Sequence, residues 1–219
     1  GGAAHAETAA GRIASLADSN WTAVRAKRRE AAIAKGAGEP LNPEWLMMRI
    51  GDLAPRDLIV VDEGVTTAAT LNTHVPYVDR HSYFGNVSGG IGWGIAASVG
   101  VQMAHPDRRV VAIIGDGSAQ YSIQALWTAA NSKTPVVFVI CNNAGYTIIK
   151  QRLTLFHGNE EYIGMDFQNP TIDARKLAEG YGMDSVRVTT GEAFEEAFAK
   201  ALAKTDGPTL IEAMVDADY

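Results

Sequence analysis

The sequence has little that would support disulfide, membrane or nucleic-acid functions. It contains one cysteine, Cys141, in 219 residues, which excludes an internal disulfide and fits a reducing cytoplasm. No run of 18 or more apolar residues and no signal-peptide pattern occurs, so we expect no membrane span. The net charge is −6, and we interpret the basic run at residues 25–29 as a solvated helix face. The chain begins with Gly-Gly and not with Met, which is typical of a tag remnant, a processed product or a fragment.

Several catalytic signatures are also absent. Cys141 ends an apolar run with no histidine near it in sequence, so we interpret it as a small buried core residue and not as a nucleophile. The absence of a G-x-x-x-x-G-K-[ST] motif excludes a P-loop NTPase. No metal-ligand spacing occurs among the histidines His74, His81, His105 and His157.

The sequence is organised as one α/β domain preceded by a tail. Residues 1–40 are rich in alanine and contain a weakly amphipathic helical segment at residues 14–35, so we interpret them as a linker or helical tail from a preceding domain. Residues 41–219 form the predicted domain. Its first helix begins with Asn42 as N-cap and Pro43 at the first helical position.

Continuous apolar segments alternate with helical ones through this domain. Strands are predicted at residues 58–62, 110–114, 136–140, 185–188 and 209–214. Helices are predicted at residues 43–53, 92–104, 120–132, 173–181 and 191–203. This alternation predicts a three-layer α/β/α domain with a mostly parallel central sheet, covered by helices on both faces.

The most informative stretch begins at Gly115-Asp116-Gly117-Ser118 and ends at Asn142-Asn143. Asp116 follows one apolar strand and Asn143 follows the next, so each strand delivers a hard oxygen ligand at its carboxyl end. Ligands bind at that edge of an open α/β sheet, and two such ligands suit Mg²⁺. Each residue alone could be a turn residue, but the pair at this spacing favours a metal site.

This pattern, GDG followed by NN, resembles the signature of the thiamine diphosphate enzymes, which hold the cofactor's diphosphate through Mg²⁺. The resemblance extends from about Leu41 to the C-terminus, and it points to the benzoylformate decarboxylase and acetolactate synthase branch. It implies the thiamine diphosphate-binding fold, with thiamine diphosphate and Mg²⁺ as cofactors. It also implies that the backbone carbonyl of Gly145 is a third metal ligand beside Asp116 and Asn143.

The resemblance places the diphosphate beside the same motif. We expect Gly115, Gly117 and Ser118 to contact it, the last two opening a helix that starts near Gln120. Free N–H groups and the helix dipole favour an anion there. Tyr146 is expected to pack on the diphosphate side.

The turn after the first strand resembles the family's first phosphate-contacting loop. We predict contacts from Thr66 through its hydroxyl and from Gly64 through its backbone. Simple N-capping by Thr66 or Thr67 is the alternative interpretation.

A glycine-rich stretch at residues 88–94 resembles the loop that meets the cofactor's aminopyrimidine. Gly89 and Gly90 would contact it through the backbone, and Ile91 would support the bent cofactor. The segment Gly92–Ala97 also matches the dinucleotide pattern G-x-G-x-x-A, but it lacks a clear preceding strand and the expected acidic residue. A nicotinamide-dependent dehydrogenase is therefore a minor alternative.

The segment at residues 146–156 is expected to cover the cofactor and to line part of the substrate pocket. Ile148 and Arg152 fall where related decarboxylases place apolar or small pocket residues. Arg152 departs from that pattern and could attract a substrate carboxylate, or it could be a surface cation.

In this superfamily a glutamate from a pyrimidine-side domain activates the cofactor, and no such domain pattern is found here. Glu63 lies in the diphosphate-side turn and should not substitute for it. We therefore predict the C-terminal cofactor-binding part of a 2-oxo acid decarboxylase, in a cytoplasmic homo-oligomer, completed by a pyrimidine-binding domain on a missing portion or another subunit. The alternatives are an acetolactate synthase-like carboligase and an inactive cofactor-binding fragment or subunit.

Overall fold

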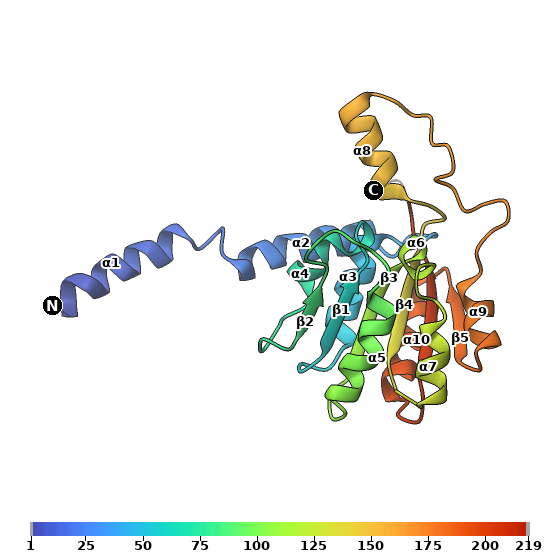
Figure 1. Ribbon diagram of the computed structural model, residues 1–219. Helices are drawn as coiled ribbons and strands as arrows, with labels where there is room; N and C mark the ends of the chain where they lie inside the picture. The colour runs from blue at the N-terminus through green and yellow to red at the C-terminus, as the bar shows by residue number, and fades with distance from the viewer. Residues whose placement is uncertain (1, 218–219) are drawn as a thin grey trace.

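The computed structural model describes residues 2–217, with side chains from residue 5 onward, and its centre is a six-stranded parallel sheet (Figure 1). The strands lie in the order β2-β1-β3-β4-β6-β5. Their bounds are β1 (Ile59–Glu63), β2 (Tyr83–Gly85), β3 (Val110–Gly115), β4 (Val137–Asn142), β5 (Asp184–Val188) and β6 (Thr209–Met214). The sheet is parallel throughout, which confirms the predicted fold class.

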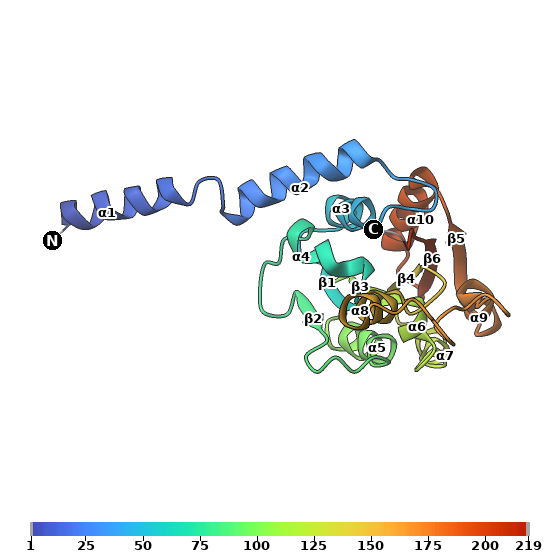
Figure 2. The same cartoon turned by 90° about the horizontal axis from the view of Figure 1, so that it is seen from above.

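Helices cover both faces of the sheet (Figure 2). One face carries α3 (Pro43–Leu53), α4 (Leu71–His74), which follows the 3₁₀ turn η1 (Thr67–Thr70), and α10 (Gly191–Ala203). The other face carries α5 (Gly94–Ala104), α7 (Ala125–Asn131) and α9 (Ala174–Gly180). The short α6 (Asp116–Ala119) and the longer α8 (Thr147–His157) lie at the carboxyl edge of the strands, and α1 (Gly2–Ser15) and α2 (Trp21–Lys35) form an N-terminal arm.

Alternate strand residues fill two hydrophobic cores. Ile113 and Val139 belong to the core under α3 and α10, together with Phe194. Ile114 and Ile140 point the other way, into the core under α5 and α7. Because both faces are covered, the strands read as continuous apolar runs. Burying each large aliphatic side chain contributes about 1.5–3 kcal/mol, so these cores hold the strand ends in fixed register.

The structure corrects the predicted helix at residues 120–132. The chain forms α6 immediately after β3, passes through turns at residues 120–124, and starts α7 at Ala125. Backbone bonds of the i→i+3 type, such as Gln120 N to Gly117 O at 3.3 Å, wind this stretch too tightly for one regular helix.

The predicted helix at residues 14–35 is also wrong, because two helices with a break between them occupy this region. Asn20 makes the break: its side chain accepts from Ala23 N at 3.0 Å as the N-cap of α2 and donates to Ala17 O at 2.8 Å. Sequence reasoning also missed the three-residue edge strand β2 and did not assign α8.

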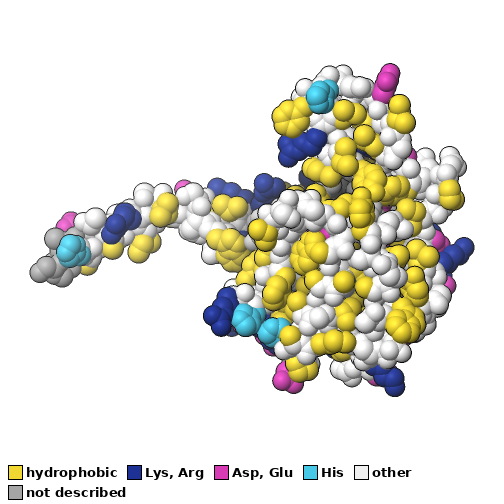
Figure 3. All heavy atoms as spheres, in the orientation of Figure 1, with side chains coloured by type: hydrophobic (Ala, Val, Ile, Leu, Met, Phe, Trp, Pro, Cys, Tyr) yellow, Lys and Arg dark blue, Asp and Glu magenta, His cyan; other side chains and the backbone are white. Residues whose placement is uncertain are grey.

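The N-terminal arm has a free and a packed part. Ala32 of α2 is fully buried in the core that contains α3, whereas α1 projects away from the body (Figure 1). Figure 3 shows hydrophobic side chains along the arm, and Ile13 and Leu16 are both exposed. None of the helices within residues 2–217 combines the length and apolar character that crossing a bilayer requires.

Candidate functional site

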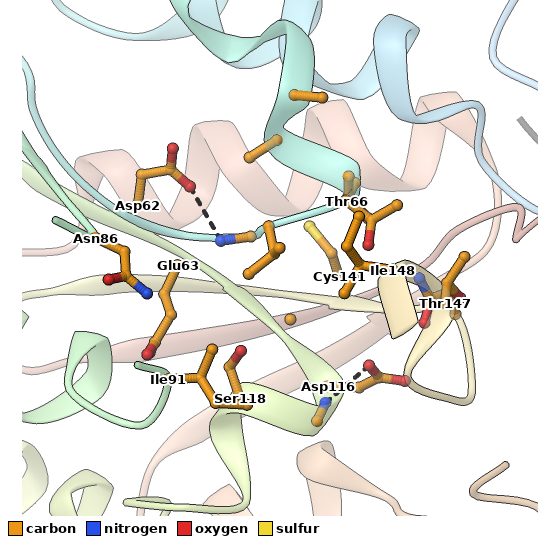
Figure 4. A pocket seen from close by; sticks show the side chains of 18 of the residues that line it. Asp62, Glu63, Thr66, Asn86, Ile91, Asp116, Ser118, Cys141, Thr147 and Ile148 are labelled. Atoms are coloured by element: carbon orange, nitrogen blue, oxygen red, sulfur yellow. Dashed lines mark hydrogen bonds between the residues drawn. The ribbon is translucent and has the colours of Figure 1, made fainter. Parts of the chain in front are cut away.

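A cavity of about 600 Å³ opens at the carboxyl ends of β1, β3 and β4 (Figure 4). The strand order changes direction between β1 and β3, and ligands of open parallel sheets bind at such a point. All predicted cofactor and metal residues except Gly90 line it: Gly64, Thr66, Gly89, Ile91, Gly115, Asp116, Gly117, Ser118, Asn143, Gly145 and Tyr146. The fold thus brings these stretches together, while their binding roles stay predictions.

Asp116 starts α6 at the end of β3, and its carboxylate is almost fully buried. One oxygen accepts from Gly117 N at 2.8 Å, and the other accepts from Gly145 N at 3.1 Å. Burial raises the pKa of Asp116 to about 6, although these backbone N–H groups oppose the shift. A cation beside the carboxylate would relieve this burial cost.

Asn143 follows β4 and faces the same cavity. Its Oδ1 atom is buried and has no hydrogen-bond partner in the described part of the chain. Leaving a buried acceptor unpaired costs about 1–3 kcal/mol, so a ligand bound to this atom would be stabilising. Within residues 2–217 no three His, Cys, Asp or Glu side chains gather into a metal site. A hard cation here would be held by one carboxylate, one amide oxygen and backbone carbonyls, which is a donor set that suits Mg²⁺.

Gly117, the residue after Asp116, has no room for a side chain beside Tyr146. A Cβ atom at Gly117 would lie 2.6 Å from Cε1 of Tyr146. Tyr146 in turn packs edge-on against Phe167, with ring centroids 4.8 Å apart. Gly117 and Ser118 lie inside α6 and do not precede a helix at Gln120, but they still face the cavity in the first turn after β3.

The loop after β1 forms another wall. Gly64 N donates to Asp62 Oδ1 at 3.0 Å, and burial raises the pKa of Asp62. Thr66 occupies the N-cap position of η1, but its side chain makes no capping hydrogen bond. The alternative interpretation, N-capping by the Thr66 hydroxyl, is therefore not seen. Thr66 therefore stays a candidate phosphate contact.

Glu63 has a role that sequence reasoning missed. Its carboxylate is 1% exposed and accepts from the backbone N–H groups of Gly92, Trp93 and Gly94, the last two at 3.1 and 2.8 Å. It thereby caps the start of α5 and ties the glycine-rich loop to β1. The signal in the sequence was an acidic residue that ends an apolar strand.

Asn86 shapes the same loop from its other end. Its Oδ1 accepts from Ser88 N and Gly89 N at 3.1 and 2.9 Å, and its Nδ2 donates to Gly90 O at 2.8 Å. Gly90 is accordingly turned to Asn86 and does not line the cavity, whereas Ile91 does (Figure 4). Asn86 was also missed, although an Asn two residues before Ser-Gly-Gly is a common turn former.

The segment after Tyr146 forms α8, above the carboxyl edge of the sheet (Figure 1). Ile148 lines the cavity as predicted, but Arg152 is exposed and does not. Cys141 is buried at the cavity floor, and burial raises the pKa of its thiol. This confirms its interpretation as a core residue, because a protonated thiol is a poor nucleophile.

Comparisons with known proteins agree with this geometry. Residues 64–213 match the family model described as thiamine pyrophosphate enzyme, C-terminal TPP binding domain. The chain is 40% identical to a benzoylformate decarboxylase of Pseudomonas aeruginosa, over 84% of this chain and 34% of that protein. It is 32% identical to an acetolactate synthase large subunit of Parasynechococcus marenigrum, over 79% of this chain and 28% of that protein.

A solved structure gives the same picture. The thiamine diphosphate-dependent 4-hydroxybenzoylformate decarboxylase of Rhodococcus jostii RHA1 matches with a TM-score of 0.77 and 42% identity, over 82% of this chain and 33% of that one. The chain therefore spans about a third of the length of these relatives.

Proposed function

The chain belongs to the thiamine pyrophosphate enzymes, of which it carries the C-terminal TPP binding domain, and from this premise we propose that its cavity binds thiamine diphosphate and Mg²⁺. The complete enzyme would be a 2-oxo acid decarboxylase of the benzoylformate decarboxylase kind. The observation that carries the cofactor proposal is the buried carboxylate of Asp116 beside the partnerless amide oxygen of Asn143, both facing one cavity.

The proposed metal ligands are Asp116, Asn143 and the backbone carbonyl of Gly145. A divalent cation satisfies the orphaned Asn143 oxygen and neutralises a carboxylate whose burial is otherwise unfavourable. Gly117, whose Cβ position is filled by Tyr146, lets the backbone come close to a phosphate.

The remaining wall residues position the organic part of the cofactor. When bound, thiamine diphosphate supplies the nucleophilic carbon that adds to a 2-oxo group and the electron sink that permits loss of CO₂. Ile91 offers an apolar support inside the cavity, and Glu63 and Asn86 hold the loop that carries it. Gly64, Thr66, Gly115 and Ser118 are the proposed diphosphate contacts.

The activating carboxylate is proposed to come from outside this chain. Glu63 cannot supply it, because its oxygens are occupied by three backbone N–H groups at the start of α5. We place the pyrimidine-binding domain on another part of the protein or on another subunit of a cytoplasmic homo-oligomer. Residues 1–40 would be the connecting tail, and residues 41–219 the diphosphate-side domain.

Native mass spectrometry of the purified protein with thiamine diphosphate and Mg²⁺ tests the cofactor proposal. We expect retention of the cofactor mass and association with a second polypeptide. A lone 23.3 kDa chain that never retains the cofactor contradicts the proposal. Full turnover of a 2-oxo acid by this chain alone would show that no outside carboxylate is needed.

The similarity to an acetolactate synthase supports a second candidate, a carboligase. A panel of 2-oxo acids supplied to the complete enzyme separates the two. Release of CO₂ and an aldehyde supports decarboxylation, and formation of an acyloin supports carboligation.

A further inference from the structure

We infer that a chain of contacts, from the half-exposed Arg187 through the buried Glu212 to the buried Asn142, positions the loop that carries Asn143 and Gly145. This inference rests on the proposed function, because it concerns the proposed metal ligands. It adds three positioning residues, on β4, β5 and β6, to the cavity residues described above.

Glu212 is the centre of the chain of contacts. It is 0% exposed on β6, between the apolar residues Ile211 and Ala213, and a buried carboxylate requires partners. Its Oε2 accepts from Arg187 Nε at 2.8 Å, and its Oε1 accepts from Asn142 Nδ2 at 2.8 Å and from Ala174 N at 3.2 Å. All three of these groups are donors, so the carboxylate is satisfied without water.

The strand register explains why these residues meet. Arg187 lies directly beside Glu212 in the parallel pairing of β5 with β6. Glu212 is paired with Ile140 of β4, and Asn142 lies two residues further along that strand, on the same face. Arg187 Nη2 also lies 3.2 Å from Asp173, which caps α9, so the outer end of the chain of contacts is anchored as well.

Glu212 fixes which way the Asn142 amide points. A carboxylate paired with a guanidinium only accepts hydrogen bonds, so it selects the orientation with the Asn142 NH₂ group facing it. The Asn142 carbonyl oxygen then faces forward and accepts from Ala144 N at 3.0 Å. The opposite orientation would place two acceptors together and two donors together.

The bond to Ala144 holds the loop that carries Asn143 and Gly145 in an unfavourable shape. Ala144 has φ +59°, in the left-handed region that a residue with a side chain avoids at a cost of about 1–2 kcal/mol. The turn leaves Asn143 Oδ1 without a hydrogen-bond partner among residues 2–217 and brings Gly145 N to Asp116 at 3.1 Å. The loop therefore presents both predicted ligands only while Asn142 keeps its orientation.

An ion pair that contains a buried carboxylate is weak evidence for stability, since desolvation of the carboxylate offsets much of the attraction. A positioning role explains better why Glu212 lies among apolar residues of β6, because an apolar residue at position 212 could not orient the Asn142 amide. Partners behind metal ligands commonly change metal affinity by about 10- to 100-fold when altered.

Binding of Mn²⁺ in the presence of inorganic diphosphate, followed by the electron paramagnetic resonance signal of free Mn²⁺, tests the inference on the whole chain. Asn142→Asp places a carboxylate against Glu212, and we expect the Kd for Mn²⁺ to rise about 10- to 100-fold. Adding Glu212→Gln to that variant restores a donor facing position 142 but gives up the bond from Ala174 N, so we expect part of the affinity to return. Circular dichroism under the assay conditions must show each variant folded, so that a changed Kd reports on the position of the loop and not on unfolding.

Lys204→Met is the matched control. It breaks another ion pair of β5, with Asp184 at the far end of the strand, and should leave the Kd unchanged. Asn142→Ala, which introduces no repulsion, gives the same test if Asn142→Asp does not fold by circular dichroism.

The outcomes separate the two proposals. If the unaltered chain binds no Mn²⁺ with diphosphate, both the proposed function and this inference fail. If it binds and the position-142 variants bind equally well, only this inference fails. Weakened binding with rescue by the double variant supports it.

Discussion

Replacing Glu63 by alanine is the change whose effect follows most directly from the structure. The Glu63 carboxylate accepts from three successive backbone N–H groups at the start of α5, and it is 1% exposed. A Cβ atom at Gly94 would lie 2.7 Å from Glu63 Oε2, which shows how closely the carboxylate and the helix start are packed. Glu63→Ala removes all of these bonds and leaves the first turn of α5 without a cap.

The contacts of Glu63 set the expected loss in the free energy of unfolding. A hydrogen bond to a charged group contributes about 1.5–3 kcal/mol to the free energy of unfolding. The full sum for three such bonds would overstate the loss. Water from the adjacent cavity can reach the freed N–H groups after truncation, so we expect a net loss of about 3 kcal/mol in the free energy of unfolding. For a chain of this length that loss lowers the Tm by about 6–12 °C.

Urea denaturation followed by far-ultraviolet circular dichroism measures this loss. Glu63→Gln keeps one acceptor oxygen and should lose about half as much. Glu160→Ala, an exposed glutamate, is the control and should unfold like the unaltered chain. If Glu63→Ala unfolds at the same urea concentration as this control, the capping argument is refuted, and with it the claim that β1 holds the glycine-rich loop.

Three further predictions concern the cavity. Asp116→Ala should abolish binding of thiamine diphosphate with Mg²⁺ in isothermal titration calorimetry, and undiminished binding would remove Asp116 from the proposed ligands. Gly117→Ala places a methyl group 2.6 Å from Tyr146, and urea denaturation should show a loss of about 1–3 kcal/mol; an unchanged unfolding midpoint would contradict the claim that Tyr146 requires glycine here. Burial raises the pKa of Asp62 in the folded chain above its value in the unfolded chain. Protonated Asp62 therefore stabilises the fold at a pH below the unfolded-state pKa, and this stabilisation is lost as the pH rises through the folded-state pKa. Asp62→Asn, which can still accept from Gly64 and donate to the Tyr83 oxygen, should therefore stabilise the chain at about pH 7 and not at about pH 3.5; equal effects at both pH values would contradict this.

The sheet and the convergence of the candidate site residues at one edge could be predicted because both depend on short-range patterns. Continuous apolar runs mark strands buried on both faces, and a polar residue directly after such a run falls at the carboxyl edge. Asp116 and Asn143 could be placed at one edge on that basis, and the structure brings both to one cavity. Asn42 and Pro43 marked the start of α3 by the same local logic.

Elements that depend on tertiary contacts could not be predicted in this way. β2 has only three residues and exists because β1 offers it a parallel partner. The break between α6 and α7 arises from i→i+3 bonds that no apolar period reveals. Arg152 was placed near the pocket by resemblance alone, and the direction of its side chain depends on how α8 sits above the sheet.

The buried carboxylates show which sequence signal was overlooked. Glu63 and Glu212 each interrupt or end an apolar strand, and a charge cannot stay at such a position without donors. The donors lie 29–31 residues away from Glu63 and 25–70 residues away from Glu212, so no local pattern names them. The position alone still carries information: an acidic residue inside a doubly covered parallel strand predicts that backbone or side-chain donors converge on it. In this chain both carboxylates fix loops at the same edge of the sheet, one beside Ile91 and the other beside Asn143.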